Sequence, residues 1–90
     1  MQSHHTIKIS GMVQGVFFRH SAKSKAEELG LSGYAKNESD GTLLIEVEGE
    51  PDELEIFSDW CKIGPTSARV DEAEVVEAPT ENYTGFEILG

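Results

Sequence analysis

The chain has 90 residues, of which 38% are apolar and 27% charged, and its net charge is −10. A chain of this length forms one small domain, which buries about 60–70% of its unfolded surface without disulfides or metals. Because phosphate backbones are bound by clustered Lys and Arg, the acidic excess argues against a general nucleic-acid binder or an anionic-membrane binder.

The first half of the chain predicts a strand, a loop, a helix and a second strand. Alternating apolar residues predict the first strand over about residues 5–11, and a glycine-bounded loop follows it. An apolar repeat of 3.6 residues predicts a helix over residues 18–29, which Gly30 ends. Residues 32–38 form a second extended segment, and Asp40-Gly41 is typical of a tight hairpin turn.

The second half repeats this order. Residues 42–48 alternate between apolar and mostly polar positions, which predicts a strand with one buried face and one wet face. Pro51 suits the start of a helix that ends at Gly64-Pro65. Two further strands are expected over residues 70–77 and 83–89.

Strand–helix–strand, a tight hairpin and a second strand–helix–strand predict two split βαβ units. Such units form a ferredoxin-like α+β sandwich, in which an antiparallel sheet carries both helices on one face, here with a short extra C-terminal strand. No linker or repeat interrupts the sequence, so we expect one domain over residues 1–90.

Few side chains are suited to nucleophilic or acid–base catalysis. The single Cys61 excludes an internal disulfide, and its place among the apolar positions of the second helix predicts a buried, unreactive thiol. His20 shares a helix face with Ser24 and Glu27, so we expect it to point into solvent. A lone thiol, with no signal-peptide or membrane-spanning segment, favours the cytoplasm.

Metal binding is not indicated either. The pair His4-His5 is interpreted as an inert part of a fraying terminus. The acidic residues, such as Glu46 and Glu48, are spread along faces that we predict to be wet, where they serve as solubilising charge. No metal and no cofactor are therefore expected.

The loop and helix start at residues 11–19 have a clear chemical use. Consecutive backbone N–H groups from about Gln14 to Arg19 can form a concave nest for an anion at the positive end of the helix dipole. Arg19 is unfavourable at that end unless an anion faces it, and its guanidinium matches two phosphate oxygens. From the residues alone, a solvated Arg19 and an ordinary turn-forming Asn37 remain open alternatives.

The loop before Arg19 is unusually apolar. Val13, Val16 and Phe17 are expected to pack against the protein. Such packing would keep the loop in place and its amides aimed at the anion.

Two motifs resemble the signatures of the acylphosphatase family. Residues 9–19 fill the pattern aliphatic-x-Gly-x-Val-Gln-Gly-Val-x-Phe-Arg completely. A second motif, Gly33-Tyr34-Ala35-Lys36-Asn37, is followed by Gly41 and Gly49 at the family's spacing. The resemblance covers nearly the whole chain.

This resemblance implies hydrolysis of small-molecule acyl phosphates to a carboxylate and inorganic phosphate, with no metal and no phosphoenzyme. It implies that Arg19 holds the phosphoryl group and that Asn37 positions the attacking water. An acyl phosphate carries an activated leaving group, so the absence of a strong base is no obstacle. The phosphate-binding residues that it implies are Gln14, Gly15, Val16, Phe17, Phe18 and Arg19.

Three other functions fit parts of the sequence. A non-catalytic phosphate- or acyl-phosphate-binding module is the main alternative, because the same domain occurs inside larger carbamoyl-transfer maturation proteins; the short length and lack of zinc-finger cysteines favour a free-standing enzyme. An RNA-recognition sheet would need exposed aromatic residues on its central strands. A copper metallochaperone would need a Cys-x-x-Cys pair. We expect a monomer without nucleic-acid or membrane partners.

Overall fold

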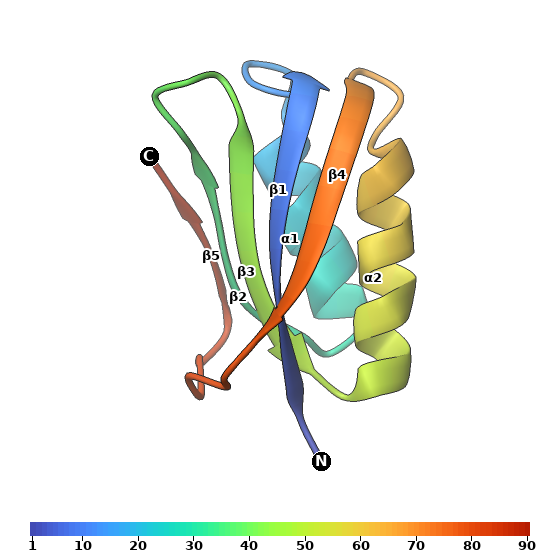
Figure 1. Ribbon diagram of the computed structural model, residues 1–90, viewed down its shortest axis with the longest axis vertical. Coiled ribbons are helices and arrows are strands. Elements are labelled where there is room, and N and C mark those ends of the chain that lie inside the picture. The colour runs from blue at the N-terminus through green and yellow to red at the C-terminus, as the bar shows by residue number, and fades with distance from the viewer.

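Five strands and two helices follow the predicted order along the chain. The computed structural model, which describes all 90 residues, confirms the α+β ferredoxin-like sandwich, with both helices on one side of the sheet (Figure 1). The strands are β1 (Ser3–Met12), β2 (Ser32–Asn37), β3 (Leu43–Gly49), β4 (Arg69–Ala78) and β5 (Phe86–Leu89), and the helices are α1 (Phe18–Glu28) and α2 (Pro51–Ile63).

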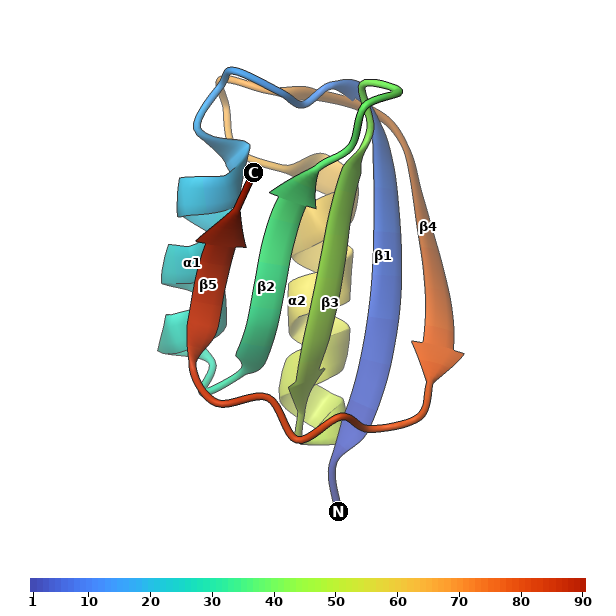
Figure 2. The same ribbon diagram turned by 90° about the vertical axis from the view of Figure 1, so that its left-hand side faces the viewer.

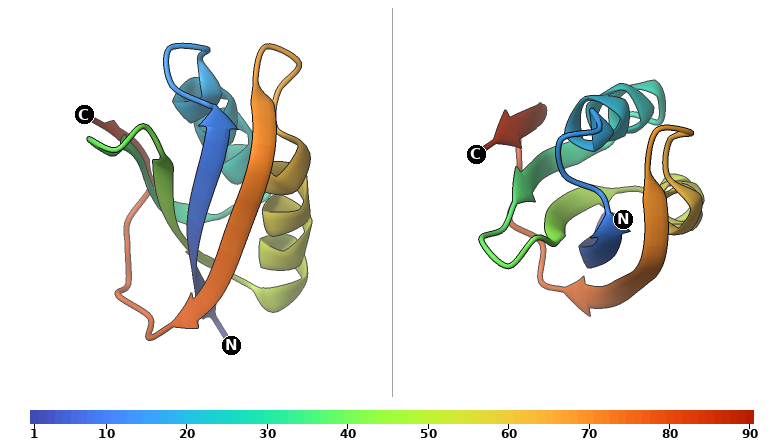
Figure 3. Two further views of the ribbon diagram at one scale, coloured as in Figure 1. Left: turned by 45° about the horizontal axis from the view of Figure 1, so that its top comes forward. Right: turned by 90° about the horizontal axis from the view of Figure 1, so that it is seen from above.

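The strand order in the sheet is β4-β1-β3-β2-β5. The four longer strands pair antiparallel, as predicted, and β5 adds a parallel edge beside β2. Residues 79–85, which we call the crossing segment, pass along the lower end of the sheet and return the chain in the direction of β2 (Figure 2). Seen from above, the sheet curves around the helices (Figure 3). No helix is long and apolar enough to cross a membrane.

Gly11 lets β1 continue past its predicted end. The pairing of β1 with β4 shifts register between Ser10 and Gly11, which marks a bulge. Gly11 has a φ of +127°, and a Cβ atom there would lie 2.2 Å from the carbonyl oxygen of Arg69. Only glycine fits this position. The strand therefore reaches Met12 before the loop begins.

The core lies between the sheet and the two helices. Phe18, Ala22 and Ala26 of α1 are buried, as the 3.6-residue repeat predicts. Cys61 is fully buried on α2, and burial raises the pKa of its thiol, so the thiol stays protonated and unreactive. Trp60 is only half-buried, and its ring packs 5.6 Å from that of Phe18.

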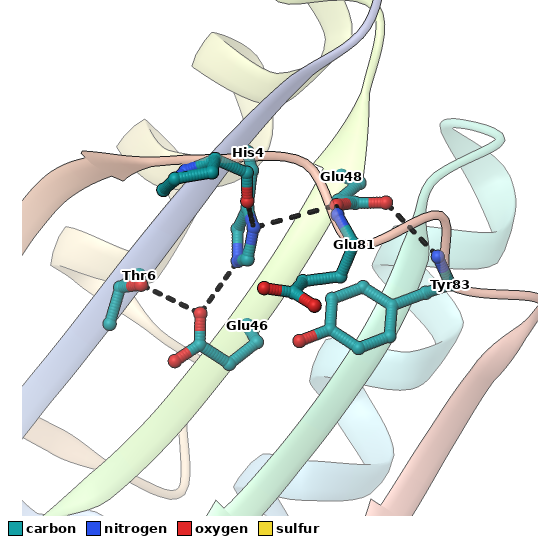
Figure 4. Close-up of polar contacts among 7 residues, drawn as sticks. His4, Thr6, Glu46, Glu48, Glu81 and Tyr83 are labelled. Carbon is teal, nitrogen blue, oxygen red and sulfur yellow. Dashed lines mark hydrogen bonds and ion pairs between the residues drawn. The ribbon is translucent and has the colours of Figure 1, made fainter.

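Three polar residues contradict the prediction of inert surface charge. His4 is 4% exposed and Glu48 is fully buried, while Glu46 is half-buried. His4 Nδ1 donates to the carbonyl oxygen of Pro79 at 2.7 Å, and its Nε2 lies 2.6 Å from Glu46 Oε1. Thr6 donates its hydroxyl to the same carboxylate oxygen at 2.6 Å (Figure 4). These residues therefore form a polar cluster within the fold.

The crossing segment covers this polar cluster and accounts for its burial. Its backbone has no strand to pair with, and buried N–H groups need an acceptor. The Glu48 carboxylate accepts hydrogen bonds from the backbone N–H groups of Glu81 and Tyr83, the latter at 3.1 Å (Figure 4). The Tyr83 ring packs edge-on against Tyr34, with 5.8 Å between centroids. Burial, with smaller contributions from Tyr34 and nearby glutamates, raises the pKa of Tyr83 to about 12.

Glu48→Gln tests whether this carboxylate holds the crossing segment. Glutamine would present an amide N–H₂ group toward a backbone N–H, so one donor would lose its acceptor. We expect the free energy of unfolding to fall by about 1–3 kcal/mol, measured by urea denaturation. Glu72→Gln, at an exposed position on β4, is the matched control and should change stability by no more than about 0.5 kcal/mol. Equal losses in the two variants would contradict this role.

Candidate active site

Three segments that are far apart in the sequence end at one edge of the sheet. Both β1 and β2 pair antiparallel with β3, so they run in the same direction, and β5 runs parallel to β2. The loop at residues 13–17, the β2–β3 hairpin and the end of β5 therefore meet above the sheet (Figure 2). The residues that the sequence predicts to bind phosphate lie at this end of the sheet.

The loop before α1 exposes a row of backbone donors. Gly15 has a φ of +71°, and Phe17, the residue that caps α1, is left-handed with φ 60° and ψ 22°. No side chain caps the helix and no acidic residue lies in its first turn. The backbone N–H groups of residues 14–20 donate to no acceptor within the protein. A left-handed residue followed by helix is a nest geometry that suits an anion.

Two side chains tie this loop to its neighbours. Gln14 Nε2 donates to the carbonyl oxygens of Glu38, at 2.8 Å, and Thr42, at 2.9 Å, across the base of the β2–β3 hairpin. Ser67 donates its hydroxyl to the carbonyl oxygen of Val16 at 2.7 Å. The loop is therefore fixed both to the hairpin and to the segment that follows α2.

The apolar residues of the loop behave in two ways. Val13 is 1% exposed and Val16 packs against the core, as predicted. The prediction that Phe17 also packs the loop is wrong, because its side chain is 76% exposed. Its left-handed backbone turns the side chain away from the core.

Arg19 is oriented by the end of β5. Its Nη1 donates to the backbone oxygens of Leu89, at 2.8 Å, and Gly90, at 2.9 Å. One turn further along α1, Lys23 Nζ donates to the carbonyl oxygen of Phe86 at 2.6 Å. Nε and Nη2 of Arg19 have no acceptor in the protein, so they can bind an anion.

Asn37 is the last residue of β2 and lies next to the end of β5. A Cβ atom on Gly90 would stand 3.7 Å from both the backbone N and O of Asn37, so Gly90, whose oxygen accepts from Arg19, lies beside Asn37. The side-chain Oδ1 of Asn37 is buried and has no hydrogen-bond partner. An unpaired buried acceptor costs about 1–3 kcal/mol, which favours a ligand or water that donates to it.

A cavity of about 240 Å³ opens beside the loop. Gly15, Phe17, Phe18 and Arg19 of the predicted site line it, while Gln14, Val16 and Asn37 do not. His20, exposed as predicted, also contributes to the wall. The full lining is Val13, Gly15, Phe17, Phe18, Arg19 and His20.

The arrangement lacks the features of a metal centre. No group of three or more His, Cys, Asp or Glu side chains is arranged to hold a metal ion. The donors at the site are backbone N–H groups and a guanidinium, which bind anions and not cations. A ferredoxin-like sandwich with these donors at a helix N-terminus has the chemistry expected of a small protein that acts on phosphoryl groups.

The acylphosphatase family model matches residues 5–88, and the chain belongs to this family. It is 47% identical to the acylphosphatase of Marinobacter nauticus over 87% of this chain and 86% of that protein. The structure of an acylphosphatase from Coxiella burnetii matches with 39% identity and a TM-score of 0.93, over 97% of this chain and 92% of that one. The whole chain also matches 12% of full-length HypF, with 37% identity and a TM-score of 0.92.

The protein is therefore a hydrolase that acts on small-molecule acyl phosphates and releases phosphate. This agrees with the function that the two sequence motifs imply.

Proposed function

We propose that the loop amides of residues 14–19, Arg19 and Asn37 carry out the hydrolysis of acyl phosphates, without a metal ion and without a phosphoenzyme. The observation that carries the proposal is the row of unpaired backbone N–H groups beside a guanidinium that β5 holds by one nitrogen. Phosphoryl transfer depends mainly on positioning and on stabilising charge, and these groups supply both.

In this mechanism, the phosphoryl oxygens bind the loop amides and the remaining N–H groups of Arg19. The unpaired Oδ1 of Asn37 accepts a hydrogen bond from a water molecule. This contact orients the water so that a lone pair on the water oxygen points toward phosphorus. The new oxygen–phosphorus bond forms while the bond from phosphorus to the carboxylate oxygen breaks. The carboxylate leaves with the electron pair and needs no acid, and a phosphoryl oxygen takes the water's proton.

The proposal extends to the domain organisation, oligomeric state, location and partners of the enzyme. We propose one domain that acts as a monomer in the cytoplasm, with no nucleic-acid or membrane partner. The net charge of −10 supports the lack of polyanionic partners, since an acidic surface repels polyanions. The free, buried Cys61 supports the cytoplasm, since free thiols persist in reducing compartments.

Arg19→Gln tests the guanidinium. Loss of a charged donor to the transition state should lower kcat/KM for benzoyl phosphate at least roughly a hundredfold, while circular dichroism shows an intact fold. The matched control is Arg69→Gln, which removes the chain's other arginine, an exposed partner of Asp71. Near-normal turnover by Arg19→Gln would contradict the role of Arg19.

Asn37→Ala tests the position of the water. Because the proposed partner of Asn37 is water, we expect kcat to fall by roughly a hundredfold and the inhibition constant of inorganic phosphate to change much less. Asn82→Gly, in the exposed crossing segment, serves as the control, since glycine tolerates the φ of +61° there. A variant that binds phosphate less tightly and keeps its kcat would instead assign Asn37 to phosphate binding, together with the loop amides and Arg19, which we call the phosphate cradle.

Removal of divalent ions tests the metal-free mechanism. Dialysis against a chelator should leave kcat and KM unaltered, because every proposed charge-stabilising group belongs to the protein. A metal-dependent phosphatase treated in parallel shows that the chelator works. Inactivation that a divalent ion reverses would refute this part of the proposal.

A further inference from the structure

Phe17 combines two unfavourable features. Its left-handed backbone is unfavourable for an ordinary L-residue, and its side chain, 76% exposed, gains little from burial. Glycine or asparagine would make the same bend at lower cost. The need for a phosphate nest therefore explains the backbone of Phe17 but not its aromatic ring.

Phe17 lies at the cavity that the phosphoryl group enters in the proposed mechanism. Phe17 lines this cavity together with Gly15 and Arg19, which belong to the proposed phosphate cradle. Val13 and Phe18, each 1% exposed, add further apolar lining.

His20 gives the Phe17 ring a neighbour on one side. Its ring lies 6.0 Å from that of Phe17, tilted by 54°. The cavity thus joins anion donors to an apolar wall.

The chemistry of the substrate brings its acyl group to this wall. In an acyl phosphate a single oxygen separates phosphorus from the carbonyl carbon, so the acyl group begins within the same cavity. We infer that Phe17 determines specificity and favours acyl phosphates whose acyl group is apolar, above all aromatic. An aromatic acyl group can stack offset or edge-on against the exposed ring, whereas a small acyl group such as acetyl leaves it in water.

Arg19 is the only permanently charged residue of the lining, and the phosphoryl group occupies its free nitrogens in the proposed mechanism. The rest of the lining offers the acyl group no charged partner. This inference rests on the proposed phosphate cradle.

The experiment measures kcat/KM for benzoyl phosphate and acetyl phosphate in the unchanged enzyme and in Phe17→Asn. Asparagine tolerates the left-handed backbone and lacks the ring. Both substrates present the same phosphoryl group, so any damage to the cradle affects both and cancels in the ratio of the two kcat/KM values. We expect the benzoyl-to-acetyl ratio to fall roughly tenfold, which corresponds to about 1.4 kcal/mol. Phe17→Leu, which keeps an apolar side chain, should give an intermediate ratio.

Ile56→Ala is the matched control. Ile56 is an exposed apolar residue on α2 outside the cavity lining, and its loss should leave the ratio unchanged. A ratio that stays within about twofold in Phe17→Asn, or that falls equally in Ile56→Ala, would overturn the inference. Failure of the proposed site gives a different result: Arg19→Gln would then retain its activity on both substrates, whatever the ratio in the Phe17 variants.

Discussion

The structure depends on a row of backbone N–H groups that the protein leaves unpaired. The backbone N–H groups of residues 14–20 donate to no acceptor within the protein, whereas most backbone N–H groups in a folded protein are paired. The neighbouring contacts keep this row fixed and open: Gln14 ties it to the β2–β3 hairpin, Ser67 holds Val16, and β5 holds Arg19. A rigid set of donors reorganises little when negative charge develops on a phosphoryl group, which is how such a site accelerates a reaction.

At the opposite end of the sheet, unpaired backbone N–H groups receive an acceptor from within the protein. There the crossing segment also has backbone N–H groups without a strand to pair with, and the Glu48 carboxylate accepts hydrogen bonds from two of them. His4 and Glu46 complete that cluster. One end of the sheet is therefore closed by a buried carboxylate that belongs to the protein, and the other end is open to an anion from outside. The first arrangement holds the crossing segment on the fold, and in the proposed mechanism the second binds substrate.

The sequence predicts the elements well because their signals are local. The 3.6-residue repeat from Phe18 and the motif that ends at Arg19 need only neighbouring residues to be interpreted. The burial of Glu48 cannot be predicted this way, since the segment that covers it comes more than 30 residues later in the chain. The apolar character of Phe17 predicts loop packing, whereas its φ of 60°, which the sequence does not show, turns the exposed side chain outward. The hydrogen bonds from Gln14 to the β2–β3 hairpin could have been expected, since Gln14 is the polar residue between Val13 and Gly15 of the loop.

The contact between Arg19 and β5 links the orientation of the guanidinium to a weak part of the sheet. β5 has only four residues, pairs on one side and runs parallel to β2, which is the less stable kind of pairing. Short edge strands of this kind open locally, at free energies well below that of global unfolding. The time that the guanidinium spends in this orientation is therefore set by fraying of β5 and not by the stability of the core, so a substitution can change one without the other.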